Sequence, residues 1–192
     1  MGGTIFVDEA SRYMFIQNQV SLGEAETIRA KHSFERGASR FGIFILGYRA
    51  DNGAYKTKDF NDDLEKQKQS IQFCGVGAHH HNGIAERAIR TVTTCGRTIL
   101  IHTILHNRKE VGLDLWPFAM DYAVYLWNKM HKKDGSNSPE ETFSSIKSDY
   151  SAIREAKCWG CPAYVLDPKH QDGEKVTTME SEIEIGSISG SL

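Results

Sequence analysis

The arrangement of apolar and polar residues predicts four strands in the first half of the chain. Residues 4–7 and 13–20 are separated by a turn, and the side chains of the second stretch alternate in character, which predicts a β-hairpin. A longer apolar stretch at 41–48 predicts a buried strand that delivers Asp51 at its C-terminal end. Residues 70–73 predict one more short strand.

Segments with the apolar spacing of an α-helix lie between these strands and also follow the last of them. Ser21, Thr57 and Asp114 are placed to cap three of the helices. The predicted helices cover approximately residues 21–37, 58–67, 83–106 and 114–131. Strands that alternate with helices after an opening hairpin predict an α/β fold, with a mixed β-sheet flanked by helices.

The composition changes after His131 and divides the chain into three regions. Residues 1–131 form the predicted core. Residues 132–168 form a C-terminal extension, with a short helix beginning at Ser138 and a strand within 158–166. Residues 169–192 are polar and rich in Gly and Ser, so we expect this tail to be disordered.

The overall composition limits the classes of function. A length of 192 residues with 40% hydrophobic residues is enough for one domain and an appendage. The net charge of −2 means that any nucleic-acid surface must be a local basic patch. The apolar run 116–130 is interrupted by Asp121 and is too short and mixed to span a bilayer. Four cysteines without a secretory leader indicate reduced, intracellular thiols, and Cys158 and Cys161 have no second pair that would support a zinc site.

The longest predicted helix carries a group of charged residues behind a Gly- and His-rich loop. At about 100° per residue, its apolar positions fall on one face: Ala85, Ala88, Val92, Cys95 and Ile99. Glu86, Arg90, Thr93 and Arg97 fall almost opposite. Such a charged face is most often simply solvated. Asp51 changes this interpretation, because a carboxylate at a strand end and another in a first helical turn are ligands that suit Mg²⁺.

Several segments resemble the copia-type retrotransposon integrases, which are ribonuclease H-like polynucleotidyl transferases. Tyr-Arg-Ala-Asp-Asn-Gly at 48–53 and His-His-Asn-Gly-Ile-Ala-Glu-Arg at 80–87 are similar to the second and third acidic motifs of that family. Thirty-four residues separate Asp51 from Glu86, a spacing similar to the family's. The resemblance continues through 115–119, 125–128 and 159–162, and covers roughly residues 3–168.

The resemblance implies a catalytic core that performs 3′-processing and strand transfer during DNA integration. Asp51 and Glu86 would be catalytic and would hold Mg²⁺ or Mn²⁺. Arg87, Arg90 and Arg97 would contact DNA phosphates, since guanidinium groups pair with phosphate oxygens. His80 and His81 belong to a loop that either contacts the DNA or, less favoured, ligates zinc. The implied partners are the element ends, the target DNA and further copies of the chain. The implied location is the nucleus, and no membrane partner is implied.

The resemblance also implies a third acid, on a central strand that precedes the hairpin in the family. Residues 3–11 are similar to the family's second strand, so we expect the first strand to be missing and a gap to open beside residues 4–7. Asp8 is the alternative third acid, but it suits the end of a hairpin better. We also expect the family's His-His-Cys-Cys zinc-binding module, which would precede the core, to be missing. We therefore expect an inactive fragment, and the alternatives are a non-catalytic remnant that binds nucleic acid weakly or a generic ribonuclease H-like nuclease.

Overall fold

The chain opens with the predicted hairpin. The computed structural model describes residues 2–51, 55–74, 82–106, 111–131, 135–166 and 183–187. Strand β1 (Gly2–Val7) pairs antiparallel with β2 (Met14–Gln19), with Phe6 opposite Phe15. The turn is closed by a hydrogen bond of 2.9 Å from the Asp8 amide to the Tyr13 carbonyl. This part of the prediction is confirmed.

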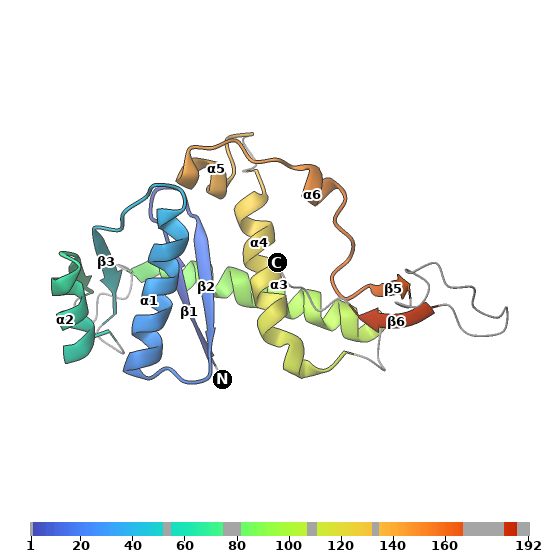
Figure 1. The fold of residues 1–192 in the computed structure, drawn as a ribbon, viewed down its shortest axis with the longest axis horizontal. Helices are drawn as coiled ribbons and strands as arrows, with labels where there is room; N and C mark the ends of the chain where they lie inside the picture. Colours follow the sequence, from blue (N-terminus) through green and yellow to red (C-terminus); the bar gives the residue numbers. More distant parts are fainter. Residues whose placement is uncertain are drawn as a thin grey trace.

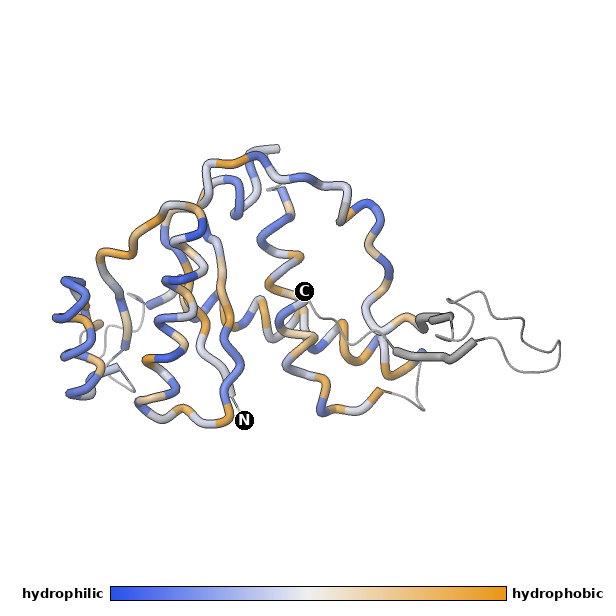
Figure 2. The backbone as a smooth tube through the Cα atoms, in the orientation of Figure 1, coloured by the Kyte–Doolittle hydropathy of each residue, from blue (hydrophilic) through white to orange (hydrophobic). Residues whose placement is uncertain are grey.

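The next four elements are α1 (Glu24–Ser39), β3 (Gly47–Ala50), α2 (Lys58–Lys66) and β4 (Ser70–Phe73). Two details of the prediction are wrong. Gly23, not Ser21, occupies the N-cap of α1. The strand predicted at 41–48 begins only at Gly47, because Phe44 and Leu46 are 80% and 77% exposed and do not enter a sheet. Figure 2 shows that α2 is mostly hydrophilic, and only Phe60 and Leu64 are buried in it.

The strands form separate two-stranded sheets instead of one mixed sheet. Strand β3 pairs parallel with β4, and β1 pairs only with β2 in the part of the chain that the structure describes. Figure 1 shows α1 on one side of the hairpin and α3 (Gly83–His106) crossing on the other. The helices therefore flank the strands as predicted, but β1 and β3 do not pair with each other.

Helices α3 and α4 (Trp116–Lys129) make the most extensive helix–helix contact in the described part of the chain. The buried positions of α3 are Ala88, Val92, Gly96, Leu100 and Thr103. A Cβ atom at Gly96 would lie 2.5 Å from the Met120 sulfur, so the two helices approach closely only because this residue has no side chain. Cys95, which we expected on the buried face, is exposed, since the contact runs through Gly96. Asp114 lies within a short 3₁₀ helix (Leu113–Leu115) and does not cap α4.

Helix α4 is fastened to the hairpin through Asn128. The Asn128 side chain accepts a hydrogen bond of 2.9 Å from the Met14 amide and donates one of 2.7 Å to the Met14 carbonyl. The Trp127 indole donates to the Arg12 carbonyl at 3.0 Å. Because both backbone groups of Met14 are satisfied in this way, Asn128 covers the outer edge of β2.

The C-terminal extension packs over α3 and α4. Helix α5 (Pro139–Ser144) lies where a short helix was predicted from Ser138, and α6 (Ser151–Arg154) follows. Helix α5 begins with a capping box between Ser138 and Glu141. The Thr103 hydroxyl donates to the Trp159 carbonyl at 2.9 Å.

Strand β5 (Pro162–Leu166) lies within the segment where a strand was predicted. It pairs antiparallel with β6 (Ile183–Ser187), which falls in the tail expected to be disordered. The other residues of that tail lie outside the described part of the chain. None of the helices in the described part combines the length and apolar character that a bilayer-spanning segment needs.

Candidate functional site

Asp51 follows β3 directly, as the sequence predicts. Strand β3 is fixed on one side by its parallel pairing with β4, in which Ala50 lies opposite Phe73. The Cys74 amide then donates to the Ala50 carbonyl at 3.0 Å and extends this pairing past the strand end. The Asp51 side chain is exposed. The site residue is therefore accessible to solvent but is carried by a well-paired strand.

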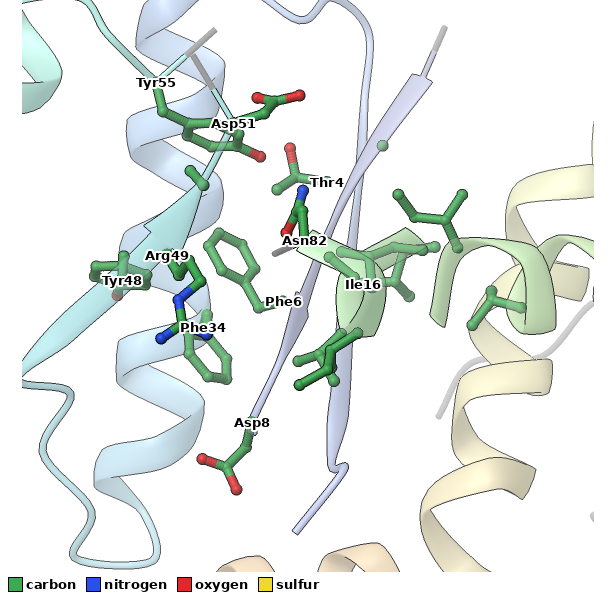
Figure 3. Close-up of a pocket in the computed structure, with 18 of the residues that line it drawn as sticks. Thr4, Phe6, Asp8, Ile16, Phe34, Tyr48, Arg49, Asp51, Tyr55 and Asn82 are labelled. Atoms are coloured by element: carbon green, nitrogen blue, oxygen red, sulfur yellow. The ribbon is translucent and has the colours of Figure 1, made fainter. Parts of the chain in front are cut away.

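Asp51 lies at one end of a cavity of about 700 Å³. Figure 3 shows its carboxylate near Tyr55, Thr4 and Asn82, which also line the cavity. Burial raises the pKa of the Tyr55 hydroxyl, a hydrogen bond with Thr4 lowers it in part, and the charge of Asp51 raises it further. Tyr55 therefore stays neutral at physiological pH and can donate a hydrogen bond beside the Asp51 carboxylate. No pattern in the sequence singles out Tyr55, because its place next to Thr4 depends on how β1 and β3 are positioned relative to each other.

Glu86 lies in the first turn of α3, as expected, and its side chain is exposed. Ile84 and Ala85 of the same turn line the cavity that Asp51 borders. The two acidic elements thus meet at one cavity, and the proximity of the two carboxylates themselves remains a prediction. The pair offers hard oxygen donors, which suit Mg²⁺ with further positions left to water or phosphate. Among the described residues, no three His, Cys, Asp or Glu side chains converge as a ready-made metal site.

Asp8 has a structural role at the end of the hairpin. One of its carboxylate oxygens accepts hydrogen bonds from the Ser11 amide at 2.7 Å and the Ser11 hydroxyl at 2.6 Å. Figure 3 shows Asp8 at the opposite end of the cavity from Asp51. This agrees with the interpretation that Asp8 ends the hairpin, and it places Asp8 away from the carboxylate of Asp51.

The arginines of α3 face solvent. Arg87, Arg90 and Arg97 are all exposed, as the helical phase predicted for Arg90 and Arg97. None of the ion pairs in the described part of the chain involves them. Their guanidinium groups are therefore available to an external anion. His80 and His81, the other residues expected to contact DNA, lie outside the described residues.

The expected gap beside residues 4–7 is present. The cavity is lined along one side by β1 and along the other by β3, including Phe6, Tyr48 and Ala50. Within the described residues, neither strand has a partner on the side that faces the cavity. The gap explains why the predicted mixed sheet is divided into two.

Comparison with known sequences supports the resemblance to retrotransposon proteins. No family model matches the chain. The retrovirus-related Pol polyprotein from transposon TNT 1-94 of Nicotiana tabacum is 25% identical over 178 residues, which are 89% of this chain. The Pol polyprotein from transposon RE1 of Arabidopsis thaliana is 28% identical over 166 residues, or 83% of this chain. The chain spans only 13% and 10% of the lengths of these two relatives.

Comparison with solved structures gives the fold. The HTLV-2 integrase catalytic core domain in complex with magnesium, in its trimeric form, has a TM-score of 0.52 at 18% identity, over 72% of this chain and 82% of that one. The BIV integrase core has a TM-score of 0.54 at 14% identity, over 73% and 84% of the two chains. The simian T-cell lymphotropic virus intasome in complex with PP2A regulatory subunit B56 gamma has a TM-score of 0.58 at 16% identity, over 95% and 60%. The fold is that of the integrase catalytic cores, which are ribonuclease H-like.

Proposed function

We propose that this chain is the catalytic core of a copia-type retrotransposon integrase. The observation that carries the proposal is the meeting of two acidic elements at one cavity: Asp51 borders it, and the turn of α3 that bears Glu86 lines it. The integrase-core fold and the plant transposon relatives support the same function. The reaction would be metal-dependent 3′-processing and strand transfer on DNA.

Asp51 and Glu86 are the residues that would hold Mg²⁺ or Mn²⁺. Bound divalent ions supply activation of the attacking oxygen and stabilisation of the leaving oxygen in phosphoryl transfer. The protein contributes the positions of the ligands. Pairing of β3 with β4 fixes the backbone that leads to Asp51, and packing of α3 against α4 fixes the helix that carries Glu86.

The exposed arginines of α3 would bind the DNA backbone. Arg87, Arg90 and Arg97 project from the helix that carries Glu86, so phosphates held there would lie beside the acidic site. His80 and His81 precede this helix in the sequence and would contact the same stretch of DNA as the arginines. The DNA partners would be the element ends and the target. The HTLV-2 integrase core is known in dimeric and trimeric forms and the simian T-cell lymphotropic virus integrase in an intasome, which supports assembly with further copies of the chain. The proposed reaction on target DNA would take place in the nucleus.

Metal binding tests the proposal. Mn²⁺ titration followed by electron paramagnetic resonance should show binding that Asp51→Asn and Glu86→Gln each weaken by at least about tenfold, or about 1.4 kcal/mol. Asp62→Asn and Glu65→Gln are matched controls, because both side chains are exposed on α2, away from the cavity lining. Equal Mn²⁺ affinity in all four variants would overturn the assignment.

One observation supports the non-catalytic alternative. Among the described residues, neither Asp51 nor Glu86 belongs to a group of three acidic, His or Cys side chains that could hold a metal ion, and Asp8 is bonded to Ser11. A remnant of this kind would retain the arginines and bind DNA weakly without metal. DNA binding that is unchanged by Mn²⁺, together with the absence of Mn²⁺ binding, would favour that alternative.

A further inference from the structure

A tight turn in the C-terminal extension brings two thiols together. The Cys161 amide donates to the Cys158 carbonyl at 3.1 Å and closes a β-turn, and both cysteines are free thiols. Gly160 has a φ of +72°, which suits the third position of a type II turn. A β-turn brings its first and fourth Cα atoms within about 7 Å of each other. Because a disulfide needs a Cα separation of about 4.4–6.8 Å, the turn holds the two cysteines in or near that range.

The core holds this turn in place. Figure 1 shows the segment between α6 and β5 reaching the C-terminal part of α3. The Thr103 hydroxyl of α3 donates to the Trp159 carbonyl at 2.9 Å, and the Trp159 side chain packs against the cluster that contains Leu100 and Ala119. Gly160 is buried, and a Cβ atom there would lie 2.2 Å from the Thr103 methyl group. Packing on α3 therefore fixes the conformation of the turn.

Both thiols lie on the side of the turn that faces α4. Burial raises the pKa of the Tyr122 hydroxyl, and neighbouring charges raise it further, those of Tyr125, Cys158 and Cys161. The two sulfur atoms are thus both within electrostatic range of one hydroxyl group. Cys158 is exposed, whereas Cys161 is half-buried. The pair therefore combines an accessible thiol with a sheltered one beside it.

The surroundings of the pair favour thiol chemistry over metal binding. A structural zinc site is built from four ligands. Among the described residues, no third His, Cys, Asp or Glu joins Cys158 and Cys161 to make such a group. Cys95 is a useful contrast, because it is exposed on α3 and has no second cysteine within one helical turn. An oxidant can modify Cys95 but cannot close a ring there with a neighbouring thiol.

We propose that Cys158 and Cys161 form a reversible disulfide by exchange with a small disulfide such as oxidised glutathione. The Cys158 thiolate attacks one sulfur of the small disulfide and expels the other as a thiolate, which takes up a proton. The Cys161 thiolate then attacks the Cys158 sulfur and expels the second small thiol in the same way. Two protein thiols lose their hydrogens, and their two electrons reduce the small disulfide. The inference goes beyond the proposed function and uses no residue of the acidic site.

Equilibration of residues 1–192 with equal concentrations of reduced and oxidised glutathione tests the proposal. After free thiols are alkylated, digestion at Lys157 and Lys169 releases one peptide that contains both cysteines. Mass spectrometry should show that this peptide has lost two hydrogens in most chains and carries no glutathione. In Cys161→Ser, which cannot close the ring, the share of Cys158 that carries glutathione should rise by at least about tenfold.

Two outcomes of this experiment would overturn the proposal. One is glutathione retained at Cys158 in most wild-type chains without the internal disulfide. The other is an unmodified Cys158 peptide under conditions in which Cys95 takes up glutathione, because the pair would then be less reactive than an isolated exposed thiol.

A second measurement separates the folded turn from the spacing of the cysteines. The ratio of internal disulfide to dithiol should be at least about tenfold higher in the native chain than in urea, since an unfolded chain samples many Cα separations. Gly160→Ala should remove this difference, because an alanine disfavours the φ of +72° and would contact Thr103. Gly135→Ala is the matched control, since its φ is +76° but nothing lies within 4 Å of the added Cβ. An equal ratio in native and unfolded wild type, or an equal loss in both variants, would overturn the proposal.

Discussion

Replacement of Lys31 by Met should destabilise the half of the fold that carries Asp51. The Lys31 side chain is 0% exposed, and its ammonium group lies 2.7 Å from Asp63 of α2 and 3.0 Å from Glu35 of α1. Glu35 also accepts hydrogen bonds of 2.6 Å from the Tyr48 hydroxyl and from Gln69. Lys31 thus connects α1 with α2 and, through Glu35, with the strand that leads to Asp51.

The size of the effect follows from the burial of the charges. Removal of one partner from a buried ion pair costs about 3–5 kcal/mol, because the remaining charge loses its closest counterion. Asp63 and Glu35 are 15% and 19% exposed, so water can solvate them partly after the substitution. We therefore expect Lys31→Met to lower the free energy of unfolding by about 3 kcal/mol, against about 5–15 kcal/mol for a whole domain.

Chemical denaturation of wild type and variant measures this difference. Arg29→Met is the matched control, since Arg29 is exposed and its ion pair among the described residues is with Glu26 one turn away, and it should cost less than about 1 kcal/mol. Lys31→Met combined with Glu35→Gln and Asp63→Asn should recover much of the loss, because the unpaired charges are removed. A loss of less than about 1 kcal/mol for Lys31→Met would refute the reasoning.

The same network predicts a pH dependence. Burial alone would raise the pKa of the Asp63 carboxyl, but the hydrogen bond and charge of Lys31, and then those of His32, hold that pKa below its ordinary value of 3.8. A folded-state pKa below the unfolded one gives stability that is complete above about pH 4 and is lost as the pH falls through the folded pKa. This acid-induced loss should be smaller in Lys31→Met, and denaturation between about pH 2 and pH 6 measures it.

Three further changes have definite expected results. Combined Arg90→Ala and Arg97→Ala should reduce the slope of log affinity for DNA against log salt by about 2, and an unchanged slope would exclude both residues from the interface. Asn128→Ala should cost about 2–4 kcal/mol in denaturation experiments, because it leaves the Met14 amide and carbonyl unpaired. Residues 1–192 alone should show no strand transfer. Asp8→Asn should lower thermal stability without changing Mn²⁺ affinity. If the chain nevertheless proves active and Asp8→Asn abolishes this activity, Asp8 is the third acid.

Local sequence patterns predicted most of the elements. The hairpin, β4, and helices α2 and α3 lie where periodicity and turn residues placed them, because each depends mainly on neighbours in sequence. The strand at 41–48 was misplaced for the opposite reason. Its apolar residues are as hydrophobic as those of a buried strand, yet Phe44 and Leu46 are exposed because no helix or strand in the described part of the chain covers them. Burial of this kind is decided by tertiary packing and not by the residues themselves.

The candidate site was predictable only in part. Asp51 and Glu86 were selected from their place at a strand end and in a first helical turn and from the resemblance to the family's acidic motifs, and their role as metal ligands stays a prediction. Tyr55, Lys31 and Asn128 were not, because each acts through a partner distant in sequence, such as Met14 for Asn128 at a separation of 114 residues. Periodicity carries no information about contacts of that range.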